Sequence, residues 1–164
     1  DVDFIQKVSE ASRSGVKVDL IVRGICCILP GVTGYTDNVR VMSVVGRYLE
    51  HPRIFSFESG NDQKIYIGSA DMMTRNTEKR VEVAAPILDQ DIRRQINHYL
   101  KVMLSDNVKA RVLGSDGKYR RKEQKEPYID SQNVFMQEAL QAKPPQEVPK
   151  KIGLLKRIGR IFSR

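Results

Sequence analysis

The first 24 residues place the strongest constraint on the fold, because they join a helical pattern to an apolar strand pattern through a glycine. Apolar side chains recur at near-helical spacing over residues 2–13, and Gly15 ends that pattern. A run rich in β-branched residues, 16–22, follows directly. A mostly apolar strand of this kind is typical of a sheet that is covered on both faces. This order of elements predicts an α/β domain, with a mixed sheet flanked by helices in a single domain.

The rest of the chain predicts further strands and helices separated by polar loops. Residues 39–45 have a strand pattern, and a short helical turn with Arg47, Tyr48 and Leu49 is expected after it. Residues 53–58 and 64–67 flank a Ser-Gly-Asn-Asp turn, which predicts a hairpin. We also expect strands at 80–85 and 108–113, a loop at 114–127, and helices at 89–104 and from a cap at Asp130 to about Leu140.

Composition excludes several classes of protein. No apolar run approaches the roughly 18 residues that a membrane-spanning helix needs. Cys26 and Cys27 are adjacent, which is poor geometry for a mutual disulfide, and with only His51 and His98 a histidine-rich metal site is not expected. The chain starts at Asp1 within a helical pattern and shows no signal peptide, so we expect a cytoplasmic domain of a longer protein.

Basic residues are concentrated in the last third of the chain, which predicts a polyanionic partner. Of 28 basic and 20 acidic side chains, residues 105–164 hold 14 and 7. Prolines mark a boundary between a domain at 1–142 and a linker with a basic tail at 143–164. Within residues 150–164, apolar and most basic side chains fall on opposite halves of a helical wheel. This pattern fits an anionic membrane surface or an acidic partner, and it also fits a helix docked on other domains or a disordered tail.

Three short segments carry side chains suited to binding phosphate. Arg23 ends the first apolar strand, where α/β sheets bind ligands, and its planar guanidinium can hold two phosphate oxygens. His51 precedes the predicted hairpin and can transfer a proton or donate a hydrogen bond near neutral pH. Gly68 and Ser69 open a tight loop that offers backbone and hydroxyl donors to an anion. The basic side chains after this loop are Arg75, Lys79 and Arg80.

Taken singly, each segment has an ordinary structural explanation: a salt-bridged arginine at a strand end, a histidine at a helix end, and a surface turn with solvated charges. Together they predict a cationic site with one histidine and few carboxylates. Such a site suits phosphoryl transfer, where positioning and electrostatic stabilisation do most of the catalysis. Asp71 is expected to orient the Gly68 loop or to pair with an arginine, and Cys26 and Cys27 are expected to be buried.

These residues resemble two known patterns, one short and one long. His51-x-Arg53-x4-Glu58 with Gly68-Ser69-x-Asp71 is similar to the H-x-K-x4-D and G-S-x-N signature of the phospholipase D superfamily, with Arg, Glu and Asp replacing Lys, Asp and Asn. A longer, ordered set of segments over about residues 1–140 resembles the C-terminal catalytic domain of polyphosphate kinases. These segments are Ile-Val-Arg-Gly-Ile-Cys-Cys (21–27), Asp-Asn-Val-Arg-Val (37–41), Gly-Arg-Tyr-Leu-Glu-His-Pro-Arg (46–53), Gly-Ser-Ala-Asp-Met-Met-Thr-Arg-Asn (68–76) and Arg-Val-Glu-Val (80–83).

The longer resemblance implies an enzyme that moves the γ-phosphate of ATP reversibly onto inorganic polyphosphate through a phosphohistidine, with Mg²⁺. It implies that this chain is the second of two phospholipase-D-like domains, and that the phosphohistidine and most magnesium ligands belong to the preceding one. By motif position, Arg23, His51 and Arg80 are expected at the ATP phosphates, with His51 assisting transfer. Candidate contacts with polyphosphate are Arg53, Ser69 and Arg75.

The same resemblance implies ATP or ADP and polyphosphate as ligands, the preceding domains of the same polypeptide as partners, and a homo-oligomer in the intact enzyme. No specific nucleic acid is expected. The isolated chain is expected to be inactive, and peripheral attachment at the inner face of a membrane through residues 150–164 is a second expected location. Two other functions stay open: a phospholipase-D-like phosphodiesterase or nuclease half-site, and a non-catalytic polyanion-binding module.

Overall fold

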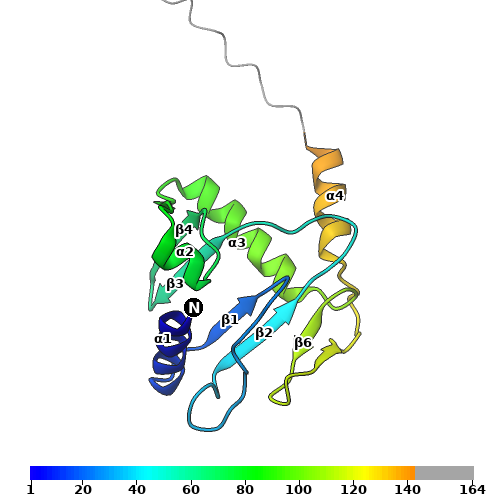
Figure 1. Ribbon diagram of the computed structural model, residues 1–164. Coiled ribbons are helices and arrows are strands. Elements are labelled where there is room, and N and C mark those ends of the chain that lie inside the picture. Colours follow the sequence, from blue (N-terminus) through cyan, green and yellow to red (C-terminus); the bar gives the residue numbers. More distant parts are fainter. Residues whose placement is uncertain (143–164) are drawn as a thin grey trace, which may run out of the picture.

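Two β-sheets and four helices make up residues 1–142, which are the residues that the computed structural model describes (Figure 1). One sheet has the strand order β1-β2-β6-β7 and the other β3-β4-β5. The strands are β1 (Val18–Ile21), β2 (Val39–Ser43), β3 (Ile54–Ser59), β4 (Asp62–Gly68), β5 (Ala84–Pro86), β6 (Arg111–Leu113) and β7 (Tyr119–Arg121). The helices are α1 (Val2–Arg13), α2 (Thr74–Lys79), α3 (Gln90–Ser105) and α4 (Ser131–Gln141). The expected α/β class, with a mixed sheet flanked by helices, is confirmed.

The four-stranded sheet carries hydrophobic core on both faces. Its first two strands are parallel, and its other two pairings are antiparallel. On one face Val41, fully buried in β2, packs in a cluster with Val8 of α1. On the other face Met42 packs with Met103 of α3. Successive residues of β2 therefore serve opposite faces, which explains why the strand is apolar along most of its length.

Helix α3 packs against both sheets. Near its middle, Asn97 exchanges side-chain hydrogen bonds of 2.9 Å with Gln63 of β4, and Arg93 donates to the Gln63 carbonyl oxygen. Toward its C-terminal end, Met103 lies in the core of the four-stranded sheet. Figure 1 shows α3 running behind both sets of strands. One helix thus connects the hairpin sheet to the four-stranded sheet.

Asp106 joins the end of α3 to the strand and the helix that follow. It is fully buried, and its Oδ1 accepts the backbone N–H groups of Val108, Lys109 and Ala110 at 2.8–3.1 Å. Its Oδ2 accepts the backbone N–H and the hydroxyl of Ser131, the first residue of α4, at 2.8 and 2.7 Å. Burial alone would raise the pKa of this carboxyl, but the hydrogen bonds, led by those from Ser131, hold it below its usual range.

Most predicted helix ends and strands agree with the structure. Asp130 is the N-cap of α4 as expected and accepts the Asn133 backbone N–H at 3.3 Å, and the predicted hairpin is formed by β3 and β4. The strand expected at 80–85 is wrong for its first part: only Ala84–Pro86 pairs, with β4. Helix α2 lies just before it and was not predicted, because its six residues are too few to show a period.

Three further expectations are wrong. Residues 46–48 form bends instead of a helical turn, and β7 lies inside the segment expected to be a loop. That strand forms because Gly117, with φ of +76°, closes a turn in which the Gly114 backbone N–H donates to the Lys118 carbonyl at 3.0 Å. Cys27 is exposed and not buried, while Cys26 is half-buried.

Two expectations concern membranes and the tail. None of the helices within residues 1–142 is both long enough and apolar enough to cross a bilayer. The amphipathic tail expected at 150–164, and the linker before it, lie outside the described residues.

Candidate functional site

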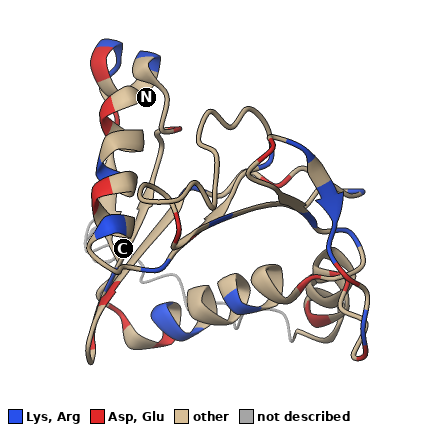
Figure 2. Cartoon of the chain, turned by 90° about the horizontal axis from the view of Figure 1, so that it is seen from below, with Lys and Arg blue, Asp and Glu red and all other residues tan. Residues whose placement is uncertain are grey.

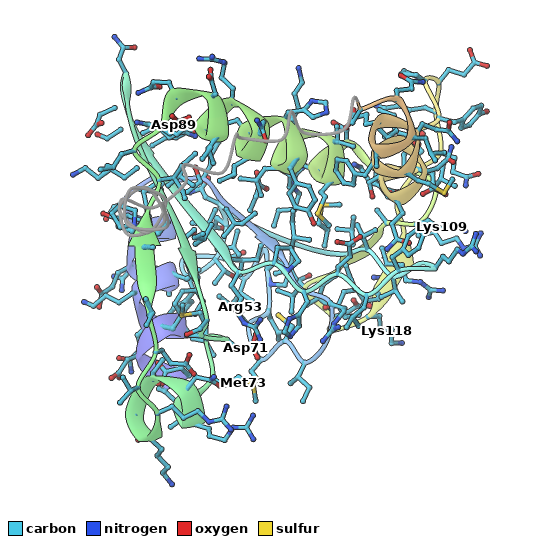
Figure 3. The ribbon with its side chains drawn as sticks, turned by 90° about the horizontal axis from the view of Figure 1, so that it is seen from above. Arg53, Asp71, Met73, Asp89, Lys109 and Lys118 are labelled. Atoms are coloured by element: carbon cyan, nitrogen blue, oxygen red, sulfur yellow. The ribbon has the colours of Figure 1, made fainter. Side chains whose placement is uncertain are left out.

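Arg53 lies between His51 and Asp71, at the start of the hairpin sheet (Figure 3). Its Nε donates to Asp71 Oδ1 at 3.1 Å and its Nη2 to Asp71 Oδ2 at 3.3 Å. Its Nη1 also donates to the His51 carbonyl oxygen at 3.3 Å. Asp71 lies in the loop that follows β4, so this two-point ion pair joins the segment before β3 to the segment after β4. The expectation that Asp71 pairs with a nearby arginine is confirmed.

The guanidinium of Arg53 lies against the face of the His51 imidazole. Nη1 is 3.0 Å from Nδ1 of the ring, and Nη2 is 3.0 Å from Nε2. The two ring nitrogens point away from each other in the ring plane, so one planar guanidinium can reach both only from above the ring. Within residues 1–142 the ring has no other hydrogen-bond partner, and the residue is exposed. The imidazole is therefore held by Arg53 and accessible from solvent.

A second cluster fixes the loop after β4 through Glu82. The Ser69 hydroxyl donates to Glu82 Oε2 and accepts the Val83 backbone N–H at 3.0 Å. The Asn76 amide donates to Glu82 Oε1 at 2.7 Å. The hydrogen bonds from Ser69 and Asn76 hold the pKa of Glu82 below its usual range, and the charges of Arg80 and Arg53 act in the same direction.

Gly68 allows this loop to pass close to its neighbours. A Cβ at this position would lie 3.1 Å from Phe55 Cε2 and 3.2 Å from the Val83 carbonyl oxygen. Its backbone N–H donates to the Arg53 carbonyl, and that of Ser69 donates to the Val83 carbonyl. The donors expected to cradle an anion at Gly68 and Ser69 are thus occupied within the protein, and the glycine serves a close approach of two backbone segments.

The segment before His51 is held by α4. Gln132 is buried, and its Oε1 accepts the Tyr48 backbone N–H at 3.0 Å. Its Nε2 donates to the Tyr48 carbonyl oxygen and to Glu50 Oε1, both at 2.8 Å. Tyr99 of α3 donates to the other Glu50 oxygen at 2.8 Å; burial and then this hydrogen bond raise the pKa of Tyr99. The chain that leads into His51 is therefore anchored to two helices.

The other predicted site residues are exposed cations. Arg75 lies on α2 and Arg80 directly follows that helix. Arg23 follows β1, and its carbonyl oxygen accepts the Ser43 hydroxyl at 3.5 Å, at the end of the neighbouring strand β2. None of these three guanidinium groups has a hydrogen-bond or ion-pair partner within residues 1–142. Their donors are thus available to a ligand.

The structure brings some of the predicted residues together and leaves others apart. His51, Arg53 and Asp71 are in contact, and Ser69 and Arg80 both act on Glu82. Within residues 1–142, no hydrogen bond or ion pair joins Arg23 to His51. Sequence analysis missed Glu82, Asn76 and Gln132. Asn76 is buried, with Oδ1 unpaired in the described part of the chain.

The described residues do not offer a magnesium site. Within residues 1–142, no group of three or more His, Cys, Asp and Glu side chains is placed to hold a metal ion. The two carboxylates of the site, Asp71 and Glu82, are already bound to Arg53 and to Ser69 and Asn76. We therefore derive no step that passes through a metal held by this chain.

Comparisons with known proteins agree on one family. Residues 1–132 match the family described as polyphosphate kinase C-terminal domain 2. The polyphosphate kinase of Bacillus cereus is 54% identical over 119 residues, 73% of this chain and 17% of the relative. Polyphosphate kinase 1 of Chlorobaculum tepidum is 42% identical over 154 residues, 94% of this chain and 22% of the relative.

A solved structure shows the same fold. The crystal structure of polyphosphate kinase from Porphyromonas gingivalis superposes with a TM-score of 0.81 at 37% identity, and covers 86% of this chain and 22% of that one. The chain thus spans about a fifth of the length of the relatives it matches. With this sequence match and this fold, the chain belongs to the polyphosphate kinase family, as its C-terminal domain 2.

Proposed function

We propose that this chain supplies the nucleotide-side half of an active site that transfers phosphate between ATP and inorganic polyphosphate. Arg23, His51 and Arg80 would bind the phosphates of ATP or ADP. A phosphohistidine in a preceding domain of the same polypeptide would carry the transferred group. The exposure of His51, held beside Arg53 and Asp71, carries this proposal, because a phosphoryl oxygen can reach the imidazole from solvent.

In this mechanism the cations supply charge stabilisation and Arg53 supplies position. A phosphoryl group in transfer carries negative charge on its oxygens, which guanidinium groups in fixed places stabilise. Arg53 is bound to Asp71 and lies against His51, so we propose that it holds the imidazole ring instead of contacting polyphosphate. His51 then donates a hydrogen bond or a proton to the oxygen that departs, and in the reverse direction it takes that proton back from the same oxygen as it attacks. Arg75 is an exposed cation of α2 that would meet polyphosphate. Ser69 would do so only by releasing Glu82.

The same arrangement disfavours a phosphodiesterase. The lysine of the phospholipase D signature is replaced by Arg53, whose donors are engaged by Asp71 and His51. Asp71 and the His51 carbonyl oxygen take three of its five N–H donors, and both of its terminal nitrogens also lie against the His51 ring, so little of the guanidinium is available to a phosphodiester. We infer that the site binds phosphate through residues around this pair.

Several parts of the proposal concern the whole protein. Mg²⁺ would accompany the nucleotide, with ligands outside this chain. The intact enzyme would be a cytoplasmic homo-oligomer, and the domain at 1–142 would be followed by a separate tail. That tail would attach to an anionic membrane; co-sedimentation with anionic vesicles, with and without residues 150–164, tests this, and equal binding would refute it.

The experiment for His51 uses the full-length protein that contains this chain. In His51→Ala, synthesis of polyphosphate from ATP should fall, while transfer of the γ-phosphate to the preceding domain should still label the enzyme. Full synthesis rates would remove His51 from the mechanism. His98→Ala is the matched control, because His98 of α3 is also exposed and, within residues 1–142, its ring bonds only to Glu138 of α4.

A further inference from the structure

The sheet register gathers cations beside Arg23. Ser43 of β2 is the register partner of Arg111 in β6, and Arg111 is the partner of Arg121 in β7. Residues directly opposite on neighbouring strands point to the same face of the sheet, about 5 Å apart. Since the Ser43 hydroxyl donates to the Arg23 carbonyl oxygen, Arg23 lies beside the same face. The order across the sheet is therefore Arg23, Ser43, Arg111 and Arg121.

A polar pocket lies at the outer end of this row. It has a volume of about 310 Å³, and its lining consists of Val45, Val108, Lys109, Arg111, Arg121 and Gln124. Three of its side chains are cations and none is a carboxylate. Figure 2 shows Lys and Arg gathered at this edge of the sheet, and Figure 3 shows Lys109 there, far from Arg53 and Asp71. A pocket of this composition fits a ligand with several negative charges in a row.

Within residues 1–142, no acidic side chain forms an ion pair with Lys109, Arg111 or Arg121. Asp116 is bound to Arg120, whose strand partner is Val112, so that pair lies on the opposite face. Asp106 is enclosed by five protein donors. Within residues 1–142, Lys109, Arg111 and Arg121 have no hydrogen-bond or ion-pair partner for their side chains. Like charges directly opposite on two strands destabilise a sheet, and an anionic ligand would remove that cost.

We propose that Lys109, Arg111 and Arg121 bind the polyphosphate chain at a distance from the reacting phosphate, along a row that continues outward from Arg23. This inference rests on the proposed function, and it deepens that function by giving the linear phosphate chain a second binding site. Successive phosphates of polyphosphate are separated by a single bridging oxygen, and this close spacing of negative charge matches a row of closely spaced cations. A flat nucleobase would gain nothing here, because the lining has no aromatic side chain for stacking.

The test removes two of the cations in the full-length protein. Arg111→Gln with Arg121→Gln should weaken the binding of long-chain polyphosphate about tenfold. It should also reduce the slope of log affinity against log salt by about 2, since two phosphate contacts are lost. ATP-dependent phosphorylation of the enzyme should keep its rate, because the pocket is remote from His51. The matched control is Lys64→Gln with Lys101→Gln, which removes the same charge from exposed residues of β4 and α3.

Two results would overturn the proposal, and a third would overturn only the proposed function. Equal loss in the control pair would show that binding follows net charge instead of this pocket. An equal loss of single-stranded DNA binding would show a surface for polyanions in general. If the unmodified protein makes no polyphosphate from ATP, the proposed function fails, and the affinity comparison for polyphosphate still decides whether this pocket binds the chain.

Discussion

The side chain of Gln132 bonds both the N–H and the C=O of Tyr48, with distances of 3.0 and 2.8 Å. This amide replaces a strand partner for a segment that belongs to neither a helix nor a sheet. Because Tyr48 is three residues from His51, the amide of α4 helps to fix where the imidazole lies. A residue 81 positions further along the chain thus acts on the site without touching it.

Replacing Gln132 with Ala should therefore destabilise the domain and disturb the site. The Tyr48 backbone groups and Glu50 lose buried partners, which should lower the free energy of unfolding by about 2–3 kcal/mol. Urea unfolding of the variant checks this value. Gln137→Ala, on the exposed side of the same helix, is the control and should change stability by less than about 0.5 kcal/mol. Equal stability of the two variants would contradict the anchoring role.

Asp71→Asn should reduce turnover more than it reduces substrate binding. An amide in place of the carboxylate weakens the two hydrogen bonds that hold Arg53. The guanidinium then no longer fixes the His51 ring. We expect kcat for polyphosphate synthesis by the full-length protein to fall at least tenfold, with the KM for ATP little changed. Asp62→Asn, in the hairpin but without a side-chain partner in residues 1–142, serves as the comparison. An unchanged kcat would show that Asp71 has no part in placing the ring.

Gly68→Ala should destabilise the hairpin sheet. The added methyl group would meet the Phe55 ring at 3.1 Å and the Val83 carbonyl oxygen at 3.2 Å, so one of them must move. Such overpacking costs about 1–3 kcal/mol. Gly24→Ala, where the new Cβ would have no atom within 4 Å, should be nearly neutral. Thermal unfolding of both variants gives the comparison, and equal Tm values would refute the close approach at Gly68.

Asp106 should make stability depend on acid. Its folded-state pKa is depressed, so its contribution is complete above the unfolded value of about 4 and is lost as the pH falls through the folded value. Asp106→Asn should cost about 2–4 kcal/mol at neutral pH, because buried N–H donors face an amide. Between about pH 5 and pH 2, where such carboxyls titrate, the variant should lose less stability than the unmodified chain, because asparagine has no carboxyl group to protonate. Urea titrations at several pH values check both points, and parallel pH profiles would contradict them.

The sequence predicted the fold best where a local signal was strong. The helix at 2–13, the cap at Asp130 and the hairpin around Gly60 all depend on neighbouring residues, and all three are confirmed. The bends at 46–48 depend on Gln132, far along the chain, and were not predicted. Strand β7 pairs with its neighbour β6 through the Gly117 turn, a local signal that the polar and basic composition of residues 114–127 obscured. The prediction that Cys27 is buried was wrong, because apolar neighbours in the sequence do not ensure burial outside a strand.

The site shows the same division. The motif spacing singled out His51, Arg53 and Asp71, and the structure places them in contact. It did not reveal that the donors of Ser69 and Gly68 would be used inside the protein, because that depends on the path of residues 82 and 83. Glu82 stood within the matched string, but its partners Ser69 and Asn76 are set by the tertiary fold. Gln132 carried no sequence signal at all, since nothing in its neighbourhood points to Tyr48.

The attachment of α3 to both sheets sets the separation between the two halves of the site. Arg23 follows β1 of the four-stranded sheet, whereas His51 precedes β3 of the hairpin sheet. Helix α3 holds the two sheets to each other: its Asn97 bonds to Gln63 of the hairpin sheet, and its Met103 packs in the core of the four-stranded sheet. The spacing between Arg23 and His51, the proposed phosphate-binding groups, therefore depends on a helix that forms no hydrogen bond with either side chain within residues 1–142. A tilt of that helix would change this spacing while leaving every side chain of the site in place.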